Sequence, residues 1–170
     1  MAQEHNHIIS IIVEHRPGVL YIVANLFRRR GFNIENISVG PAEKVGSARM
    51  TIMVRGDDRT MEQVVKQLNK LIDVIKVTRL NPEFIVKREL ALIKVNATNT
   101  KARSDLINYA EIFRARVVDV SSESLMIELT GTSDKIDAFI NLMKPFRVKE
   151  LARTGITALS RGTKSVKIDE

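Results

Sequence analysis

Hydrophobic side chains recur along the chain at two different spacings, and the alternation of these spacings predicts strands and helices in a fixed order. Residues 7–13 form a short apolar run, broken by one serine, that predicts a buried strand. Residues 17–30 carry apolar side chains at the spacing of an amphipathic helix, with Pro17 in its first turn and Gly31 as its stop. Residues 33–39 follow as a second strand.

Three further segments complete this unit. In residues 47–56, SARMTIMVRG, apolar and polar side chains alternate, which predicts a half-exposed strand with one buried face and one open, largely polar face. Asp57 or Asp58 can cap a second helix, whose apolar stripe runs through residues 61–71. A fourth strand is expected around residues 75–77, so the predicted order is βαββαβ.

The segment 80–83, with the sequence LNPE, interrupts this pattern, because proline cannot continue a strand ladder. We therefore predict two domains, residues 1–82 and 83–170. Beyond the boundary the same order of elements returns. Strands are expected at 90–95, 117–120 and 124–131 and within 148–159, and helices at 104–114 and from a cap at Ser133.

A βαββαβ unit folds most simply as a ferredoxin-like domain, a four-stranded antiparallel sheet with two helices on one face. We therefore expect an α+β protein with two tandem domains of this kind. The second face of each sheet must find cover elsewhere, and the edge strands must be paired or blunted. If the edge strands of two copies pair across a two-fold axis, their free backbone N–H and C=O groups become hydrogen-bonded. We therefore expect oligomerisation.

The composition is that of an ordinary globular protein, with 44% hydrophobic and 28% charged residues. The chain has no cysteine, its start lacks the features of a secretion signal, and its apolar runs are too short to span a bilayer. We therefore expect a cytoplasmic protein that is neither exported nor embedded in a membrane.

The formal net charge of +7 favours an acidic partner, either nucleic acid or an anionic protein surface. The basic residues are spread along the chain, and the triplet 28–30 lies in the last turn of a predicted helix. Cations there oppose the negative end of the helix dipole, which is the simpler interpretation of the triplet.

Gly18 and Asn33 lie at the two ends of the helix predicted over residues 17–30 and are the best candidates for binding a small molecule. Gly18 permits close approach to a helix start that favours a carboxylate, and the Asn33 amide offers a donor and an acceptor. A helix of about 14 residues is roughly 20 Å long, so within one chain both cannot touch one small ligand. They can meet across a two-fold axis. The alternative is that Gly18 only opens a helix and Asn33 only follows a turn.

Apolar side chains beside these polar groups can supply the walls of such a site. They are Val19, Leu20 and Ile34. A helix start, an amide and apolar walls together suit a small aliphatic amino acid. These residues are therefore compatible with an amino-acid site formed by two copies of the chain, while the plain interpretation as a helix start and a turn stays open.

Several longer segments resemble one known family. They are PGVLYIVANLFRRRGFNIENISVGP and SARMTIMVRGDD in the first half, and KRELALIKV, AEIFRARVVDVS, ELTGTSDKIDAF and ARTGITALSRG in the second. Together they make residues 7–162 similar to the small regulatory subunit of acetohydroxyacid synthase, also called acetolactate synthase. The resemblance implies an N-terminal ACT domain for effector binding and dimerisation, followed by a C-terminal ferredoxin-like domain.

The resemblance also implies that the chain is not itself an enzyme and carries no cofactor. In this family a separate catalytic subunit uses thiamine diphosphate, Mg²⁺ and FAD to condense pyruvate with pyruvate or 2-oxobutyrate, in branched-chain amino-acid biosynthesis. The small subunit activates that enzyme and confers feedback inhibition, usually by valine. The expected partners are therefore the catalytic subunit, a second copy of the chain, and valine or a related amino acid.

Carried onto this chain, the family's effector site falls on the first loop and helix start of one copy and on the start of the second strand of its neighbour. The implied effector-binding residues are His15, Pro17, Gly18, Val19, Leu20, Asn33 and Ile34. The family commonly has Asn or Asp at the position of His15, so a contact from this side chain would change affinity or selectivity. His15 can equally be a solvated loop residue.

A basic RNA-binding module is the main alternative function, because RNA-recognition domains share the βαββαβ order. The third strand of such a module should carry exposed aromatic side chains, and residues 47–56 contain none. We therefore expect no nucleic-acid partner.

Catalysis by this chain is a second alternative, but the sequence has three histidines, no cysteine and no signature of a nucleophile with its base. His5 and His7 could bind a metal only with ligands from elsewhere in the chain, so a solvated N-terminus is the simpler interpretation. We predict no catalytic residue and no metal site.

Overall fold

The computed structural model describes residues 5–163 and residue 166, which belong to two compact units. Unit 1 comprises the chain up to Lys87 together with the chain from Ile156 onward, and unit 2 comprises Arg88–Gly155. We call residues 156–163 and 166 the return segment. This division differs from the predicted domains 1–82 and 83–170, because the return segment packs against the first sheet.

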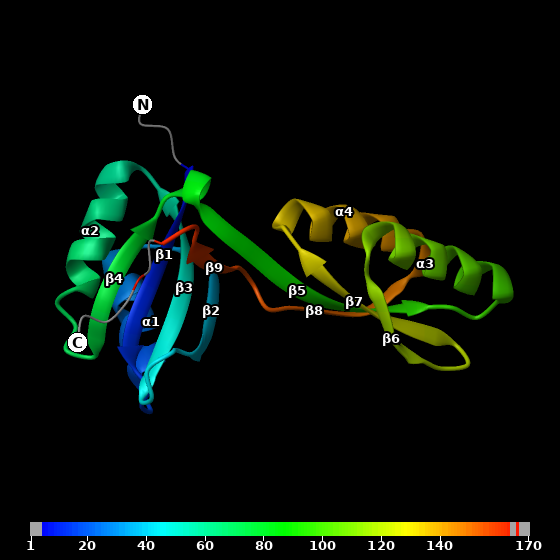
Figure 1. Ribbon diagram of the computed structural model, residues 1–170, viewed down its shortest axis with the longest axis horizontal. Helices are drawn as coiled ribbons and strands as arrows, with labels where there is room; N and C mark the ends of the chain where they lie inside the picture. The colour runs from blue at the N-terminus through cyan, green and yellow to red at the C-terminus, as the bar shows by residue number, and fades with distance from the viewer. Residues whose placement is uncertain (1–4, 164–165, 167–170) are drawn as a thin grey trace. The chain divides into compact units, whose positions relative to one another are not determined.

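Unit 1 has the predicted βαββαβ order, and its antiparallel strands are arranged as β2-β3-β1-β4 (Figure 1). The elements are β1 (His5–Glu14), α1 (Val19–Arg30), β2 (Ile34–Pro41), β3 (Ser47–Gly56), α2 (Asp58–Leu68), β4 (Val74–Leu80) and the short helix η1 (Pro82–Phe84). Because β2 and β4 end this order, they are the edge strands of the sheet.

Local sequence sets the end of α1 and the start of α2 as predicted. Gly31 adopts φ 69° at the end of α1, a backbone conformation that favours glycine, and its N–H donates to the carbonyl of Arg28. Asp57 caps α2, because its Oδ1 accepts a 2.7 Å hydrogen bond from the N–H of Thr60.

Both faces of the unit 1 sheet are covered. One face packs against α1 and α2 and forms the main core of the unit. On the other face, strand residues pack against the return segment; the cluster is Ile8, Ile12, Leu80, Ile85, Ile156, Ala158 and Val166. The prediction of a half-exposed strand at 47–56 is therefore wrong. Thr51, on the face predicted to be open, is only 2% exposed.

Unit 2 repeats the βαββαβ order, with antiparallel strands arranged as β6-β7-β5-β8 and with α3 and α4 side by side over one face (Figure 1). The elements are β5 (Ile85–Asn96), which begins in unit 1, α3 (Thr100–Phe113), β6 (Arg116–Val120), β7 (Ser124–Gly131), α4 (Ser133–Met143), η2 (Lys144–Phe146) and β8 (Val148–Arg153). In the return segment, β9 (Thr157–Ser160) pairs with β5. The α+β class with two tandem ferredoxin-like domains is confirmed.

The start of α4 differs from the prediction that Ser133 caps it. Thr132 occupies the N-cap position and makes no side-chain cap bond. Ser133 Oγ instead donates to the carboxylate of Glu89, a buried residue that also accepts a 3.1 Å bond from Arg153 Nε. This network joins β5, α4 and β8 within unit 2. None of the described helices is both long enough and apolar enough to cross a membrane.

Candidate functional site

The loop between β1 and α1, residues 15–18, is exposed and anchored at both sides. The N–H of His15 donates to the carbonyl of Gly46 at 2.8 Å, in the hairpin between β2 and β3. The N–H of Glu14, at the end of β1, donates to the carbonyl of Asp73 at 2.9 Å, just before β4. Two neighbouring segments of unit 1 therefore hold the backbone at this end of β1, while residues 15–18 stay exposed.

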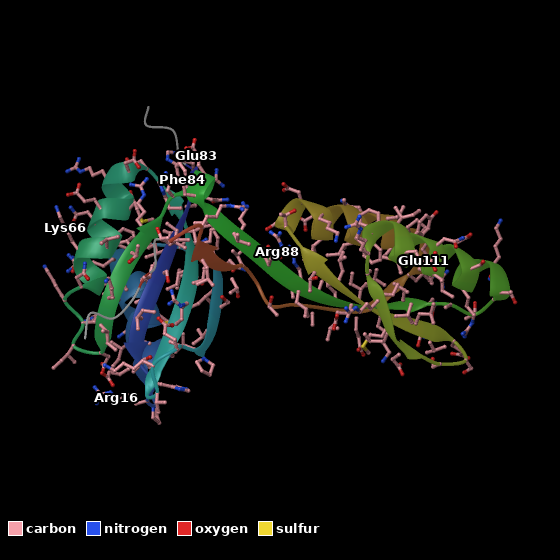
Figure 2. The ribbon with its side chains drawn as sticks, viewed as in Figure 1. Arg16, Lys66, Glu83, Phe84, Arg88 and Glu111 are labelled. Atoms are coloured by element: carbon pink, nitrogen blue, oxygen red, sulfur yellow. The ribbon has the colours of Figure 1, made fainter. Side chains whose placement is uncertain are left out.

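Arg16 contributes a side-chain anchor to this loop. Its Nε donates a 2.8 Å hydrogen bond to Oδ1 of Asp73, whose side chain is only 3% exposed. The hydrogen bond and the charge of Asp73 raise the pKa of the Arg16 guanidinium. No local spacing in the sequence indicates this pair, because Asp73 lies 57 positions from Arg16. Figure 2 shows Arg16 and Phe84 at opposite ends of unit 1.

Gly18 occupies the N-cap position of α1 with φ 90°, so the helix begins at Val19 and Pro17 lies before it. This corrects the expectation that Pro17 belongs to the first turn. No side chain caps the first-turn N–H groups, and the space where a Cβ of Gly18 would lie is open. A small carboxylate can therefore approach the positive end of the helix dipole without a steric barrier.

Asn33 lies beyond the other end of α1, immediately before β2, and is exposed. Its Nδ2 donates a 2.7 Å hydrogen bond to Oε1 of Glu35, which leaves its carbonyl oxygen directed to no described protein donor. The 12 residues of α1 span about 18 Å, so one chain does not bring Gly18 and Asn33 together.

The three predicted apolar walls have different surroundings in the structure. Leu20 is 49% exposed beside the loop, whereas Val19 is buried in the unit 1 core. Ile34 is partly buried and packs on the edge of the same core. Of these three side chains, Leu20 is thus the one most available to a ligand or a partner in a single chain.

The first part of α1 exposes three consecutive apolar side chains. Tyr21 is 71% exposed, and Leu20 and Ile22 are also exposed. Val39 is exposed on the edge strand β2. It pairs with Met50, which packs under the helices, so Val39 lies on the same face of the sheet as α1. Exposed apolar side chains next to an open sheet edge are typical of an interaction surface.

The class of protein follows from these features and from the similarity of the sequence to known protein families. Two tandem ferredoxin-like domains, the first with an open glycine-started helix beside an edge strand, define an ACT-type α+β protein. A family model described as an AHAS small subunit-like ACT domain matches residues 9–76. A second, described as the small subunit of acetolactate synthase, matches residues 88–162.

Individual relatives agree over nearly the whole chain. A probable acetolactate synthase small subunit from Methanothermobacter thermautotrophicus is 61% identical over 160 residues, which cover 94% of this chain and 95% of that protein. The acetolactate synthase small subunit of Mycolicibacterium smegmatis is 48% identical over 160 residues, 94% of each chain. A crystal structure of the small subunit from Thermotoga maritima superimposes with a TM-score of 0.89 at 48% identity, covering 94% of this chain and 99% of that one. The chain belongs to the acetolactate synthase small-subunit family.

The RNA-binding alternative gains no support from these findings. In RNA-recognition domains the open sheet face stacks on bases. In unit 1 that face is covered by the return segment, and Ile156, Ala158 and Val166 occupy the place where bases would stack.

Proposed function

We propose that the chain is a non-catalytic regulatory subunit that binds a branched-chain amino acid, foremost valine, between the unit 1 domains of two copies. It activates a separate catalytic subunit, and the bound amino acid reverses this activation. Membership of the small-subunit family supports the existence of such a partner. Thiamine diphosphate, Mg²⁺ and FAD belong to the catalytic subunit in this proposal, and the cytoplasmic location stays a prediction.

The observation that carries the proposal is the separation of Gly18 from Asn33 at opposite ends of α1, with both residues exposed. Each end has polar groups that suit one part of an amino acid: first-turn N–H groups for the carboxylate, and an amide for the ammonium. Neither end by itself encloses a ligand.

A two-fold axis beside β2 brings the two ends together. If the β2 edges of two copies pair antiparallel, their α1 helices lie antiparallel and side by side. The start of one α1 then comes next to the end of the other, and so to Asn33 of the second copy. Such pairing also buries Leu20 and Tyr21, whose exposure in the single chain is otherwise unfavourable.

Feedback follows if the amino acid prefers one arrangement of the two copies and the catalytic subunit prefers another. A coupling of about 1 to 3 kcal/mol between the two binding events, roughly 5- to 150-fold, is sufficient and must be reciprocal. An apolar wall distinguishes valine from leucine by only about 1 to 3 kcal/mol per methylene. We therefore assign the ligand to the branched-chain class and place valine first.

Reconstitution tests the proposal. The catalytic subunit of the same organism is assayed for acetolactate formation alone, with this chain, and with this chain plus valine, leucine or isoleucine. We expect the chain to raise the rate and valine to lower it again. The purified chain with pyruvate and the catalytic cofactors should form no acetolactate. Turnover by the chain alone, or a rate indifferent to its addition, would contradict the proposal.

Substitution at Gly18 tests the placement of the site. Gly18→Asp puts a carboxylate where the ligand carboxylate should bind, so calorimetry should show loss of valine binding. The matched control is Gly162→Asp, because Gly162 also has a positive φ and open space around its Cβ position. Both variants place an aspartate at a positive φ and add the same charge. Equal effects of the two variants on valine affinity would reject the placement.

A further inference from the structure

Three side chains that could bind a metal ion meet at the beginning of β1, at the opposite end of that strand from the candidate amino-acid site. His5 and His7 come from β1, and Asp58 comes from the first turn of α2. One ligand atom from each residue lies within 4.8 Å of the others. The sequence indicated that the two histidines needed a ligand from elsewhere in the chain, and the fold supplies Asp58.

The geometry of His7 is that of a preoriented metal ligand. The residue is buried, and its Nε2 lies 3.1 Å from the carbonyl oxygen of Gly56. A carbonyl can only accept, so Nε2 carries the proton and Nδ1 keeps its lone pair. A histidine that donates one ring N–H to a backbone carbonyl and turns the other nitrogen toward the ion is the usual arrangement in metal sites.

Arg79 of β4 now occupies the position between these ligands. One guanidinium nitrogen, NH2, lies 3.1 Å from His7 Nδ1 and 2.5 Å from Asp58 Oδ1. A single positively charged nitrogen thus contacts both the imidazole lone pair and the carboxylate. The Arg79 side chain is 46% exposed, so it can rotate into solvent and leave the position open.

We propose that His5, His7 and Asp58 form a binding site for a divalent first-row transition metal, with Zn²⁺ as the reference ion, and that Arg79 occupies this site until the metal displaces it. Two imidazole nitrogens and one carboxylate oxygen are ligands that suit Zn²⁺, Co²⁺ or Ni²⁺, whereas Mg²⁺ and Ca²⁺ prefer all-oxygen sites. Water would complete the coordination. The bound metal would tie the start of β1 to the start of α2.

This site is independent of the proposed regulatory function. The 10 residues of β1 span roughly 30 Å, so His5 and the loop at residues 15–18 lie at opposite ends of the strand. Metal binding and valine binding can therefore be measured separately, and failure of one leaves the other standing.

The test uses the full-length, untagged chain after treatment with a chelator. Calorimetry with ZnCl₂, and visible absorption with CoCl₂, measure stoichiometry and affinity for the wild type and for variants. We expect one Zn²⁺ per chain, with affinity lowered about tenfold or more in His5→Ala and in Asp58→Asn. Both positions are exposed, so both variants should fold, and thermal melting without metal verifies this.

Two further variants separate the proposed site from adventitious binding. His15→Ala removes the third histidine of the chain, which is also exposed, and should leave Zn²⁺ affinity unchanged. Arg79→Met removes the competing cation and should make binding tighter. The proposal is overturned if no stoichiometric Zn²⁺ binds, if His5→Ala and Asp58→Asn bind as the wild type does, or if Arg79→Met weakens binding.

Discussion

Arg16 shows how a single residue can position a site that it need not contact. Its side chain fixes the exposed loop before α1 to Asp73, a buried acid on another segment of unit 1. A buried carboxylate without a hydrogen-bond donor or a cation is unfavourable. Arg16 therefore contributes to stability chiefly because it pairs with the buried charge of Asp73. The loop that begins α1 therefore depends on a contact far away in the sequence.

Arg16→Met should lower the melting temperature, because it leaves the buried Asp73 carboxylate without its cation. Adding Asp73→Asn to this variant should restore part of the loss, since an amide buried without a charge partner is less unfavourable than a carboxylate. Thermal melts of the two single variants and the double variant check this. Strict additivity of the two changes would mean that the side chains do not interact.

Asp57 gives a prediction for pH. Hydrogen bonding to Thr60 at the start of α2 lowers the pKa of the Asp57 carboxyl below its ordinary value. A carboxyl with a lowered folded-state pKa contributes stability above its unfolded pKa of about 3.8, and that stability is lost as pH falls through the folded pKa. Asp57→Asn keeps a cap but cannot titrate, so its melting temperature should fall less between pH 5 and pH 3, as pH-dependent melts would show. A wild-type curve parallel to that of Asp57→Asn would contradict this assignment.

At the scale of elements, periodicity predicted most of what the structure contains, because it depends on local spacing. The cap at Asp57 and the stop at Gly31 are confirmed for the same reason: each acts within one turn of its own position. The predicted cap at Ser133 is wrong, because Ser133 bonds instead to Glu89, which lies 44 positions away. Likewise, the pattern showed that the unit 1 sheet needed cover on a second face but could not show that the return segment supplies it.

Adjacent residues of β9 test the role of the return segment. Ala158 is 1% exposed against the second face of the unit 1 sheet, whereas Leu159 is 54% exposed. Ala158→Asp buries an unpaired charge and should destabilise the protein by about 2 kcal/mol or more. Leu159→Asp, in the same strand, should change the free energy of unfolding by no more than about 0.5 kcal/mol. Urea unfolding measures both, and similar losses in the two variants would contradict the packing described for this segment.

At the scale of the whole molecule, the proposed amino-acid site needs residues from two chains. The length of the helix predicted from the sequence leads to this proposal, and the structure is consistent with it, because α1 separates Gly18 from Asn33 and Val19 faces inward. The sequence alone does not predict the exposed apolar side chains of α1 beside β2, because their exposure depends on which neighbours the fold provides. The central claim is therefore that two copies share each site.

Mixing two defective variants measures this claim most directly. Each proposed site takes Gly18 from one chain and Asn33 from the other. A dimer of Gly18→Asp chains or a dimer of Asn33→Ala chains should therefore bind no valine, because both of its sites lack one of these residues. Co-refolding the two chains in equal amounts should produce mixed dimers in which one of the two sites receives Gly18 from one chain and Asn33 from the other. Random pairing restores about a quarter of the wild-type sites, which calorimetry can count. A mixture that binds no valine, although mixed dimers form, would contradict the account.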